Sequence, residues 1–440
     1  MKKYKVLSES YLTNDYIAKL IQDYKTTELP RLNKLYDYYL GKTDILKKTT
    51  KDPSKPNNKV VSPHSKYISD TTTSYFIASP VVYNSKADTE LLQLVSAILE
   101  ANDEHALNSQ IAKQASIMGV GYELNYLDEN GDYQLANLDP REVFLIYDSK
   151  IKGNVIAGVR FYSVNMFDEK IEYVEVYYRD RIEFGVLEGN HLTIDLENTE
   201  EHYFNEVPII QYLNNDEGQG DFEQVISLID SYDVVVSSTT DDIEAFSDSY
   251  MVVSGTNQYD IEEFADMKEN KIILAGENGK VEWLVKDQTN QQVESYKNRL
   301  KSDIYTLAQV PNLSDENFAN AQSGESMKYK LFSLETLTAI KERNFKKALQ
   351  KRIKLITETL NKKRASALDY TEIKMKFSRN MPQNLTNMAD IASKLRGIIS
   401  DHSLLSILSF IESPDEEMEK IKEERQDPFY TEMEQLEGDA

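Results

Sequence analysis

Hydrophobic residues follow a helical spacing at both ends of the chain and a two-residue spacing in between. In the first part they recur every three or four positions, the repeat of a helix with one apolar face. This spacing predicts helices over residues 13–25, 28–40, 67–76, 91–99 and 107–118. Gly41, Pro80 and Gly119 follow three of these segments, and both residue types favour the ends of helices.

From residue 121 to residue 213 the spacing changes to two, which is typical of β-strands. Strands at 122–127 and 133–138 flank Asn130-Gly131, a dipeptide that readily supplies the positive φ angles of a tight hairpin. Further strands are predicted at 143–147, 155–163, 171–178 and 209–213, and earlier at 81–83. The middle of the chain is therefore predicted to be β-rich.

Two amphipathic helices, at 221–247 and 289–310, enclose a short insertion of mixed character. Val234, Val235 and Val236 lower the helix propensity of the first helix, so packing must hold it. The insertion is predicted to contain a strand at 250–254, a helical turn or two at 261–267, and a hairpin of strands 271–275 and 280–285. We expect the two helices to lie side by side.

The longest uninterrupted helical pattern begins at Ser323, after a loop rich in turn-forming residues that starts at Pro311. No proline or glycine occurs between Glu325 and Ala365, so a single helix of roughly 60 Å is predicted. The segment 323–365 contains twelve lysines and arginines and four glutamates, a net charge of +8 in a chain of net charge −24.

The remaining pattern predicts one strand and three helices. The strand lies at 373–377, and two helices follow at 385–398 and 402–411. A third opens with Ser413, Pro414 and Glu416, which fit the N-cap, N1 and N3 positions of a capping box. The whole pattern predicts a fold of the α+β class that ends in an acidic tail.

Charge is distributed very unevenly. Residues 182–267 contain 21 aspartates and glutamates and no lysine or arginine, whereas residues 42–66 form a basic loop. The acidic stretch is interpreted either as a solvated surface or as a wall that a polyanion passes without binding, since carboxylates repel phosphate within about 8 Å. For the basic loop, a solvated surface is favoured over a phosphate site.

Residues that would carry catalysis are not arranged in a recognisable motif. The sequence has no cysteine, which excludes disulfides, thiolate metal sites and cysteine nucleophiles. Its five histidines are scattered, and Gly276 to Lys280 lacks the spacing of a phosphate-binding loop. Asp128 to Asp132 has its glycine in the wrong position for an EF-hand. There is neither a secretory signal pattern nor a run of 18 apolar residues, so we expect a soluble, untargeted protein.

Four stretches of the sequence resemble the portal proteins of tailed bacteriophages, specifically the siphovirus type of Gram-positive hosts. They are QVPNLSDE (309–316), SGESMKYKL (323–331), residues 57–83, and GVGYELNY (119–126). The order of helix, αβ insertion, returning helix, loop and long helix is also similar.

The resemblance implies a portal fold divided into named regions. These are a wing at 1–220, a first stem helix at 221–248, a clip at 249–287, a second stem helix at 288–310, a tunnel loop at 311–323, a long wing helix with a returning strand at 324–382, and a helical crown with an acidic tail at 383–440. The crown and tail are short for the family.

The resemblance also implies site residues. Those of the tunnel loop, which would face DNA, are Asn312, Leu313, Ser314, Asp315, Glu316, Asn317, Phe318, Ala319, Asn320, Ala321 and Gln322. Those of the stem channel are Asp230, Asp233, Asp241, Asp242 and Glu244, and those of the clip, which would bind partners, are Gln258, Tyr259, Asp260, Glu262, Glu263 and Lys268. No catalytic residue, metal or cofactor is implied.

The implied function is a ring at one capsid vertex through which DNA is packaged and ejected. The implied partners are further copies of the chain, twelve in the ring, double-stranded DNA, the terminase large subunit, a head-completion adaptor, scaffold and the major capsid protein, but no membrane. Assembly would take place in the host cytoplasm. Two alternatives remain open from the residues: a metal-dependent nuclease that uses Asp241 and Asp242, and a structural adaptor that forms no ring.

Overall fold

The computed structural model describes most of the chain, in two compact units. The first unit comprises Met1–Asp315 and Lys330–Asn380, and the second comprises Glu316–Tyr329 and Met381–Ala440. The described residues are 2–53, 55–85, 89–166, 169–247, 251–254, 272–273, 280–283, 290–313, 328–379, 390, 392–406, 408, 411 and 414–426.

The first long element is a single helix, α1 (Asn14–Tyr39), where the sequence predicted two. The prediction of a break near residue 26 was therefore wrong. The hydroxyls of Thr26 and Thr27 donate to the backbone carbonyls of Gln22 and Asp23, at 2.7 to 3.0 Å, so these side chains are satisfied inside the helix.

Three shorter helices follow, close to their predicted positions. They are α2 (His64–Ile77), α3 (Thr89–Ala101) and α4 (Glu104–Met118). Gly119 ends α4 with a positive φ of 86°, and a Cβ at this position would lie 2.2 Å from the carbonyl oxygen of Gly218. Only glycine permits this close crossing, which brings the chain back to the start of α5.

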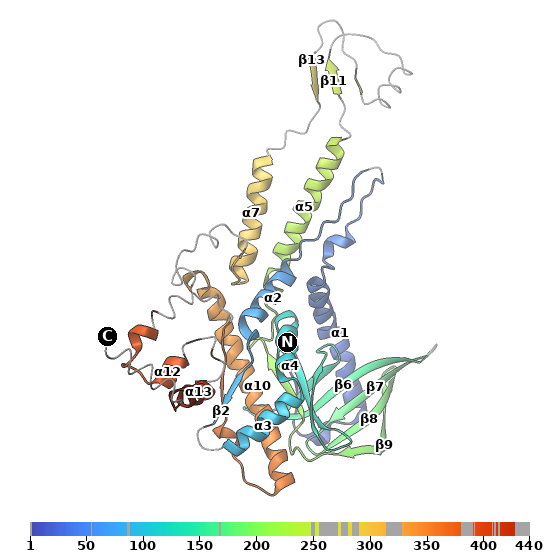
Figure 1. Cartoon of the computed structure of the whole chain (residues 1–440). Helices are drawn as coiled ribbons and strands as arrows, with labels where there is room; N and C mark the ends of the chain where they lie inside the picture. Colours follow the sequence, from blue (N-terminus) through green and yellow to red (C-terminus); the bar gives the residue numbers. More distant parts are fainter. Residues whose placement is uncertain are drawn as a thin grey trace, which may run out of the picture. The chain divides into compact units, whose positions relative to one another are not determined.

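A six-stranded sheet lies beside α1, in the order β1-β5-β6-β7-β8-β9 (Figure 1). Its strands are β1 (Tyr4–Val6), β5 (Val143–Asp148), β6 (Val155–Met166), β7 (Glu169–Tyr177), β8 (Arg181–Glu188) and β9 (His191–Glu201). The sequence did not predict β1, β8 or β9. Most of β9 is exposed, so it lacks the alternation of apolar and polar residues that marks a half-buried strand.

A second sheet contains the predicted hairpin. Strands β3 (Val120–Leu127) and β4 (Tyr133–Leu138) pair antiparallel, and β10 (Ile209–Leu213) pairs with the other edge of β3. Gly131 adopts a φ of 81° in the connecting turn, which confirms the turn predicted from Asn130-Gly131. Strand β2 (Val82–Asn84) pairs instead with β14 (Lys374–Lys376), far along the chain.

The two helices around the insertion are α5 (Ile226–Ser247), preceded by the 3-10 turn η3 (Glu223–Val225), and α7 (Asn290–Leu307). Between them β11 (Met251–Ser254) pairs with both β12 (Ile272–Ile273) and β13 (Lys280–Trp283). The predicted hairpin of β12 with β13 was wrong, because β11 lies between these strands. The predicted helical turn at 261–267 lies outside the described residues.

The long helix α10 (Phe332–Arg364) passes through the main hydrophobic core and contacts α2, α3 and β10. The core also includes residues of α4, and its members include Phe76, Leu91, Ile111, Tyr212, Phe345, Leu349 and Ile353. The ring of Phe345 packs 4.7 Å from that of Tyr212 and 5.4 Å from that of Phe76, measured between centroids. The predicted start of this helix, residues 323–327, lies outside the described residues.

The second unit contains α12 (Asp401–Leu405) and α13 (Pro414–Gln426). Pro414 is the first residue of α13, as predicted, while Ser413 is outside the described part. The helix predicted at 402–411 is shorter than expected, and of 385–398 only residues 390 and 392–398 are described. Two further 3-10 turns, η1 (Glu9–Tyr11) and η4 (Tyr370–Glu372), connect elements of the first unit. Among the described residues, no helix is long and apolar enough to cross a membrane.

Candidate functional site

Helices α5 and α7 pack side by side and run in opposite directions, with the small β11 sheet at one end (Figure 1). Residues 42–53 and 55–62, here called the strap, run along another side of α5 and include the 3-10 turn η2 (Asp44–Lys47). The α5–α7 pair and the strap together form the candidate site.

Acidic and hydroxyl side chains on one side of α5 hold the strap. Asp233 accepts hydrogen bonds from the Thr43 hydroxyl (2.7 Å) and the Ser62 amide (2.9 Å). One turn further on, the Ser237 hydroxyl accepts from the Val60 amide (3.0 Å).

Asp241 makes the most extensive contact with the strap. It accepts hydrogen bonds from the Asn58 amide (2.6 Å) and side chain (2.9 Å), and it forms an ion pair with Lys48 (2.5 Å). Glu244 accepts from the Asn58 side chain (2.6 Å). The basic loop of the sequence is therefore bound, in part, by the acids of α5.

Burial and pairing shift the pKa values of Asp233 and Asp241 in opposite directions. Asp233 is fully buried, and this burial raises its pKa above the ordinary value although Thr43 and Ser62 donate to it. Asp241 is also partly desolvated, but Lys48 and Asn58 outweigh that effect and hold its pKa below the ordinary value. At neutral pH the Asp241 carboxylate is thus charged and matched to a lysine.

The chain leaves α7 through a short, well-anchored segment. Gln309 has a left-handed φ of 58° and turns the backbone away from the helix. The Tyr67 hydroxyl of α2 donates to the Pro311 carbonyl (3.1 Å) and accepts from the Leu313 amide (2.9 Å). One side chain therefore holds two points on the first residues of the loop.

Aromatic contacts join this anchor to both paired helices. The Tyr305 ring of α7 packs edge-on against Tyr67, with centroids 5.2 Å apart, and its hydroxyl lies 3.1 Å from Nδ1 of His64. The His64 ring also packs against Tyr232 of α5, at 4.7 Å. Burial, with a smaller effect of Lys301, lowers the pKa of His64 to about 4, so the imidazole is neutral at pH 7.

Two buried cations of α10, Arg352 and Lys341, fix this helix to the rest of the first unit. Arg352 is completely buried and pairs with Glu104 (2.9 Å) and with Glu123. Closer to the α5–α7 pair, Lys341 of α10 binds Asp221, which precedes η3. Burial lowers the pKa of Lys341, but Asp221 opposes this shift.

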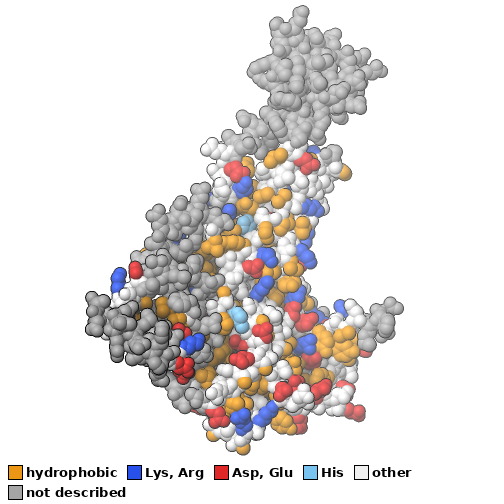
Figure 2. All heavy atoms as spheres, viewed as in Figure 1, with side chains coloured by type: hydrophobic (Ala, Val, Ile, Leu, Met, Phe, Trp, Pro, Cys, Tyr) orange, Lys and Arg blue, Asp and Glu red, His pale blue; other side chains and the backbone are white. Residues whose placement is uncertain are grey.

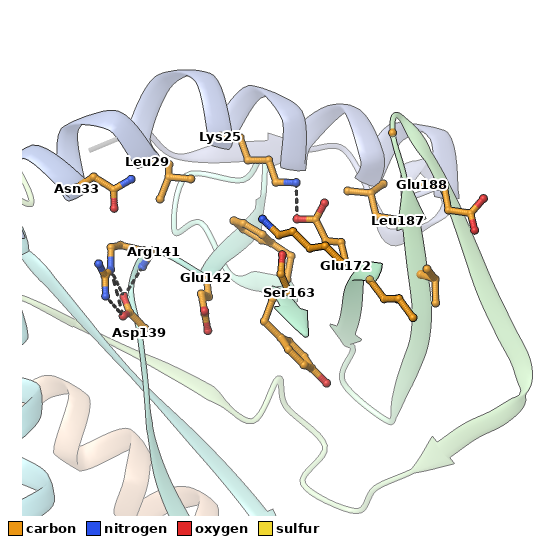
Figure 3. Close-up of a pocket in the computed structure, with 16 residues that line it drawn as sticks. Lys25, Leu29, Asn33, Asp139, Arg141, Glu142, Ser163, Glu172, Leu187 and Glu188 are labelled. Carbon is orange, nitrogen blue, oxygen red and sulfur yellow. Dashed lines mark hydrogen bonds and ion pairs between the residues drawn. The ribbon is translucent and has the colours of Figure 1, made fainter. Parts of the chain in front are cut away.

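A hollow of about 1010 Å³ lies between α1 and the six-stranded sheet (Figure 3). Lys25 of α1 pairs there with Glu172 of the sheet, and Arg141 pairs with Asp139 at 2.6 Å. Both cations are thus engaged by carboxylates of the hollow itself, and we assign no ligand to it.

In the part of the chain that the structure describes, no group of three or more histidine, aspartate or glutamate side chains is placed to hold a metal ion. Asp241, one of the two acids of the nuclease alternative, forms an ion pair with Lys48 and accepts a hydrogen bond from the Asn58 amide.

A family model decides between the alternatives. The model of the family described as "Phage portal protein, SPP1 Gp6-like" matches residues 18–428, from within α1 to just beyond α13. The chain belongs to this family. The resemblance noted in the sequence is thus confirmed, and the function is that of a phage portal protein.

Two curated relatives of this portal protein have similar lengths. The portal protein of Bacillus phage SPP1 is 26% identical over 437 residues, covering 93% of this chain and 86% of the relative. The portal protein of Clostridium phage phiCD119 is 26% identical over 421 residues, covering 87% and 90%. Among solved structures, a chain from the neck of an empty GTA particle computed with C6 symmetry gives a TM-score of 0.47 at 11% identity, covering 78% of this chain and 88% of that chain.

The structure divides the predicted stem-channel residues of the portal protein into two groups. Asp230 accepts a hydrogen bond from Tyr38 (2.5 Å), and Asp233 and Asp241 bind the strap, so these three face their own chain. Asp242 and Glu244 are exposed, although Glu244 also accepts a hydrogen bond from Asn58 of the strap. The opposite charges of the basic loop and of the acidic helix without basic residues were a signal that the two segments could bind each other. No pattern along the sequence showed that they are neighbours in the fold.

Most other predicted site residues lie outside the described residues. Of the tunnel-loop set, Asn312 and Leu313 are described and follow the Tyr67 anchor, whereas Ser314 to Gln322 are not. The clip set, Gln258 to Lys268, is also outside the described part. Sequence reasoning missed Tyr67 and His64, since an aromatic residue on an apolar helix face is usually a core residue.

Proposed function

We propose that this portal protein assembles into a ring of twelve copies with the α5–α7 helix pairs around a central channel. Double-stranded DNA would pass through the channel during packaging and ejection. The observation that carries the proposal is the family match over residues 18–428, in a chain whose paired helices are connected through a small sheet. A phage portal is a structural part of the virion, and membership of this family supports assembly of the chain into a ring.

The charges of α5 support passage rather than tight binding of DNA. The helix has no basic residue, and cations are what proteins use to hold phosphate; of its five acids, Asp242 and Glu244 are exposed. Lys48, from the strap, is neutralised by Asp241. A surface of this kind repels the DNA backbone weakly and offers it few fixed contacts.

We further propose the following regional roles. Residues 249–287 would form the clip that meets the terminase large subunit and later the head-completion adaptor. Residues 311–323 would form the tunnel loop, and residues 383–440 a crown. Scaffold and the major capsid protein would contact the wing during assembly in the host cytoplasm. The ring would have no catalytic activity of its own, and the terminase would supply the energy of packaging.

The mass of the native protein tests the proposal. Twelve copies of the 50.6 kDa chain give about 607 kDa, which native mass spectrometry can distinguish from neighbouring copy numbers. Negative-stain images of the same sample should show rings with a central hole. A particle of another copy number would correct the number of subunits only.

A sample that remains monomeric when scaffold and capsid protein are present would contradict the ring. Magnesium-dependent cleavage of DNA that is lost in both Asp241→Ala and Asp242→Ala would contradict the absence of catalysis. The first outcome tests ring assembly and the second tests catalysis. Both the assembly state and the nuclease activity are measured on the same preparation, so that they can be compared directly.

A further inference from the structure

The outer side of α10 carries a concentration of positive charge. Between residues 343 and 354 the exposed and half-buried side chains are those of two amides, one arginine and four lysines, and this part of the sequence has no acidic residue. The chain as a whole has a net charge of −24. The proposed function assigns no role to this basic surface.

Four of these cations lack a carboxylate partner. Here called the basic stripe, they are Arg343, Lys346, Lys347 and Lys351, and none lies within 4 Å of a carboxylate in the described part of the chain. Arg343 donates to the Ala339 carbonyl of its own helix (3.4 Å), which leaves its charge uncompensated. On the face of the molecule drawn in Figure 2, by comparison, basic and acidic side chains are mixed.

Lys351 shows most clearly that an anion is missing. Its side chain is half-buried, and burial lowers the pKa of the ammonium group; Glu206 opposes this shift and the charge of Lys354 adds to it. Glu206 forms its ion pair with Lys354, which also lies 3.7 Å from Glu358. A further anion beside Lys351 would therefore stabilise its charged form.

The basic stripe has a fixed geometry. Arg343, Lys347 and Lys351 are spaced by four positions, so they follow one side of the helix over about 12 Å, and Lys346 lies beside them. The opposite side of the helix is held in the core by the buried Arg352. One strand of duplex DNA carries a charge about every 3.4 Å along the axis, so the stripe spans about three or four phosphates.

The residue types of this surface favour a duplex over other polyanions. Protein interfaces have an apolar centre and few lysines, whereas every exposed or half-buried side chain from 343 to 354 is polar. Sites for single-stranded nucleic acid stack bases on exposed aromatic rings, and Phe345, the one aromatic residue of this segment, is buried. Unpaired cations without apolar neighbours match a sugar-phosphate backbone.

We propose that the basic stripe of α10 binds the phosphate backbone of double-stranded DNA, at a site separate from the α5–α7 pair. The choice of DNA rests on the proposed function, in which the chain meets duplex DNA during packaging and ejection. Binding is independent of base sequence, because phosphate contacts carry no sequence information. The base-free α5 lets a duplex pass, and the basic stripe holds one.

The dependence of DNA binding on salt tests this site. A fluorescent duplex of about 30 base pairs is titrated with the full-length chain at several salt concentrations and followed by anisotropy. The triple variant Arg343→Gln/Lys347→Gln/Lys351→Gln should bind about tenfold more weakly or worse at about 0.1 M salt. Its plot of log affinity against log salt concentration should be shallower by about 2.7, or about 0.9 for each lost phosphate contact.

A matched control has the same change in net charge at cations that are already paired. It is Lys2→Gln/Lys34→Gln/Lys47→Gln, whose lysines form ion pairs with Asp23 or Asp44 at 2.6 to 3.1 Å. The control should bind the duplex with the affinity and salt dependence of the parent chain. Circular dichroism of both variants verifies that they are folded.

Three outcomes would overturn the proposal. The first is a parent chain that does not bind the duplex at about 50 mM salt, where phosphate contacts are strong. The second is an equal loss of affinity in the triple variant and the control. The third is binding of poly-L-glutamate in preference to the duplex, with loss of that binding in the triple variant, which would assign the stripe to an acidic protein.

Ring formation is read separately, by native mass spectrometry of the same samples. Absence of rings in the parent chain would contradict the proposed function, and the titrations would still decide whether the stripe binds a duplex. Intact rings in a triple variant that has lost duplex binding would support the proposal, because the substitutions then remove the DNA contact without affecting assembly.

Discussion

At the scale of single residues, the centre of the first unit depends on a charged side chain. Arg352 of α10 lies between Glu104 of α4 and Glu123 of β3, and it also donates to Asn108 (2.8 Å). All four of these side chains are buried. The charges are therefore stable only together, and loss of one partner leaves the others unpaired.

Arg352→Met should lower the free energy of unfolding by about 3–5 kcal/mol, because it leaves two buried carboxylates without their cation. Urea unfolding followed by circular dichroism measures the change, at equal protein concentration and assembly state. Arg343→Met, an exposed arginine on the same helix, is the control and should stay within about 0.5 kcal/mol of the parent. Equal stability of the two variants would mean that the buried network contributes little.

Tyr67 has a different role, since its hydroxyl holds two backbone groups at the start of the loop. Tyr67→Phe removes both hydrogen bonds and keeps the ring that packs on Tyr305. We expect faster amide hydrogen exchange at Leu313 and a stability loss of only about 0.5–1.5 kcal/mol. Tyr11→Phe, at an exposed tyrosine, is the control, and unchanged exchange at Leu313 in Tyr67→Phe would remove Tyr67 as the anchor.

At the scale of elements, the strap and α5 form a unit whose attachment depends on pH. The pKa of Asp241 is lowered in the folded chain, so its contacts add stability above its ordinary pKa and lose it as the pH falls towards the folded value. The pKa of Asp233 is raised, so its protonation favours the folded state at low pH. The two anchors of one strap thus respond to acid with opposite signs.

Acidification should therefore release the Asp241 end of the strap first. We expect the Asn58 amide, which donates to Asp241, to lose protection from hydrogen exchange as the pH falls below the ordinary range of aspartate, after correction for intrinsic rates. The Ser62 amide, which donates to Asp233, is the internal control and should keep its protection. Parallel loss at both amides would show that the strap detaches as a whole.

At the scale of the whole molecule, the proposed tunnel loop can be separated from ring formation. Deletion of residues 319–322 shortens the loop and leaves helices α5 and α7 unchanged in sequence. We expect rings of normal mass and a loss of DNA packaging in an assay with terminase and proheads. Loss of the rings themselves would show that these residues serve assembly.

Local sequence signals determined many of the elements. Asn130-Gly131 marked the β3–β4 turn, and Gly131 supplies the positive φ angle that this turn needs, which glycine adopts at low cost. Gly119 marked the end of α4, and the apolar spacing predicted α5, α7 and α10. The motifs around the loop and the long helix also indicated the portal family, which the family match confirms.

Only the tertiary structure decided which distant segments meet. Strand β11 lies between β12 and β13, Arg352 is buried between two glutamates, and Asp233 and Asp241 bind the strap, although 171 or more positions separate these acids from their strap partners. Spacing along the chain reports the repeat of a helix or strand and the side that is apolar. Spacing does not show which distant segment packs against the polar face of a helix or strand. A carboxylate that faces solvent and a carboxylate that pairs with a lysine give the same sequence pattern.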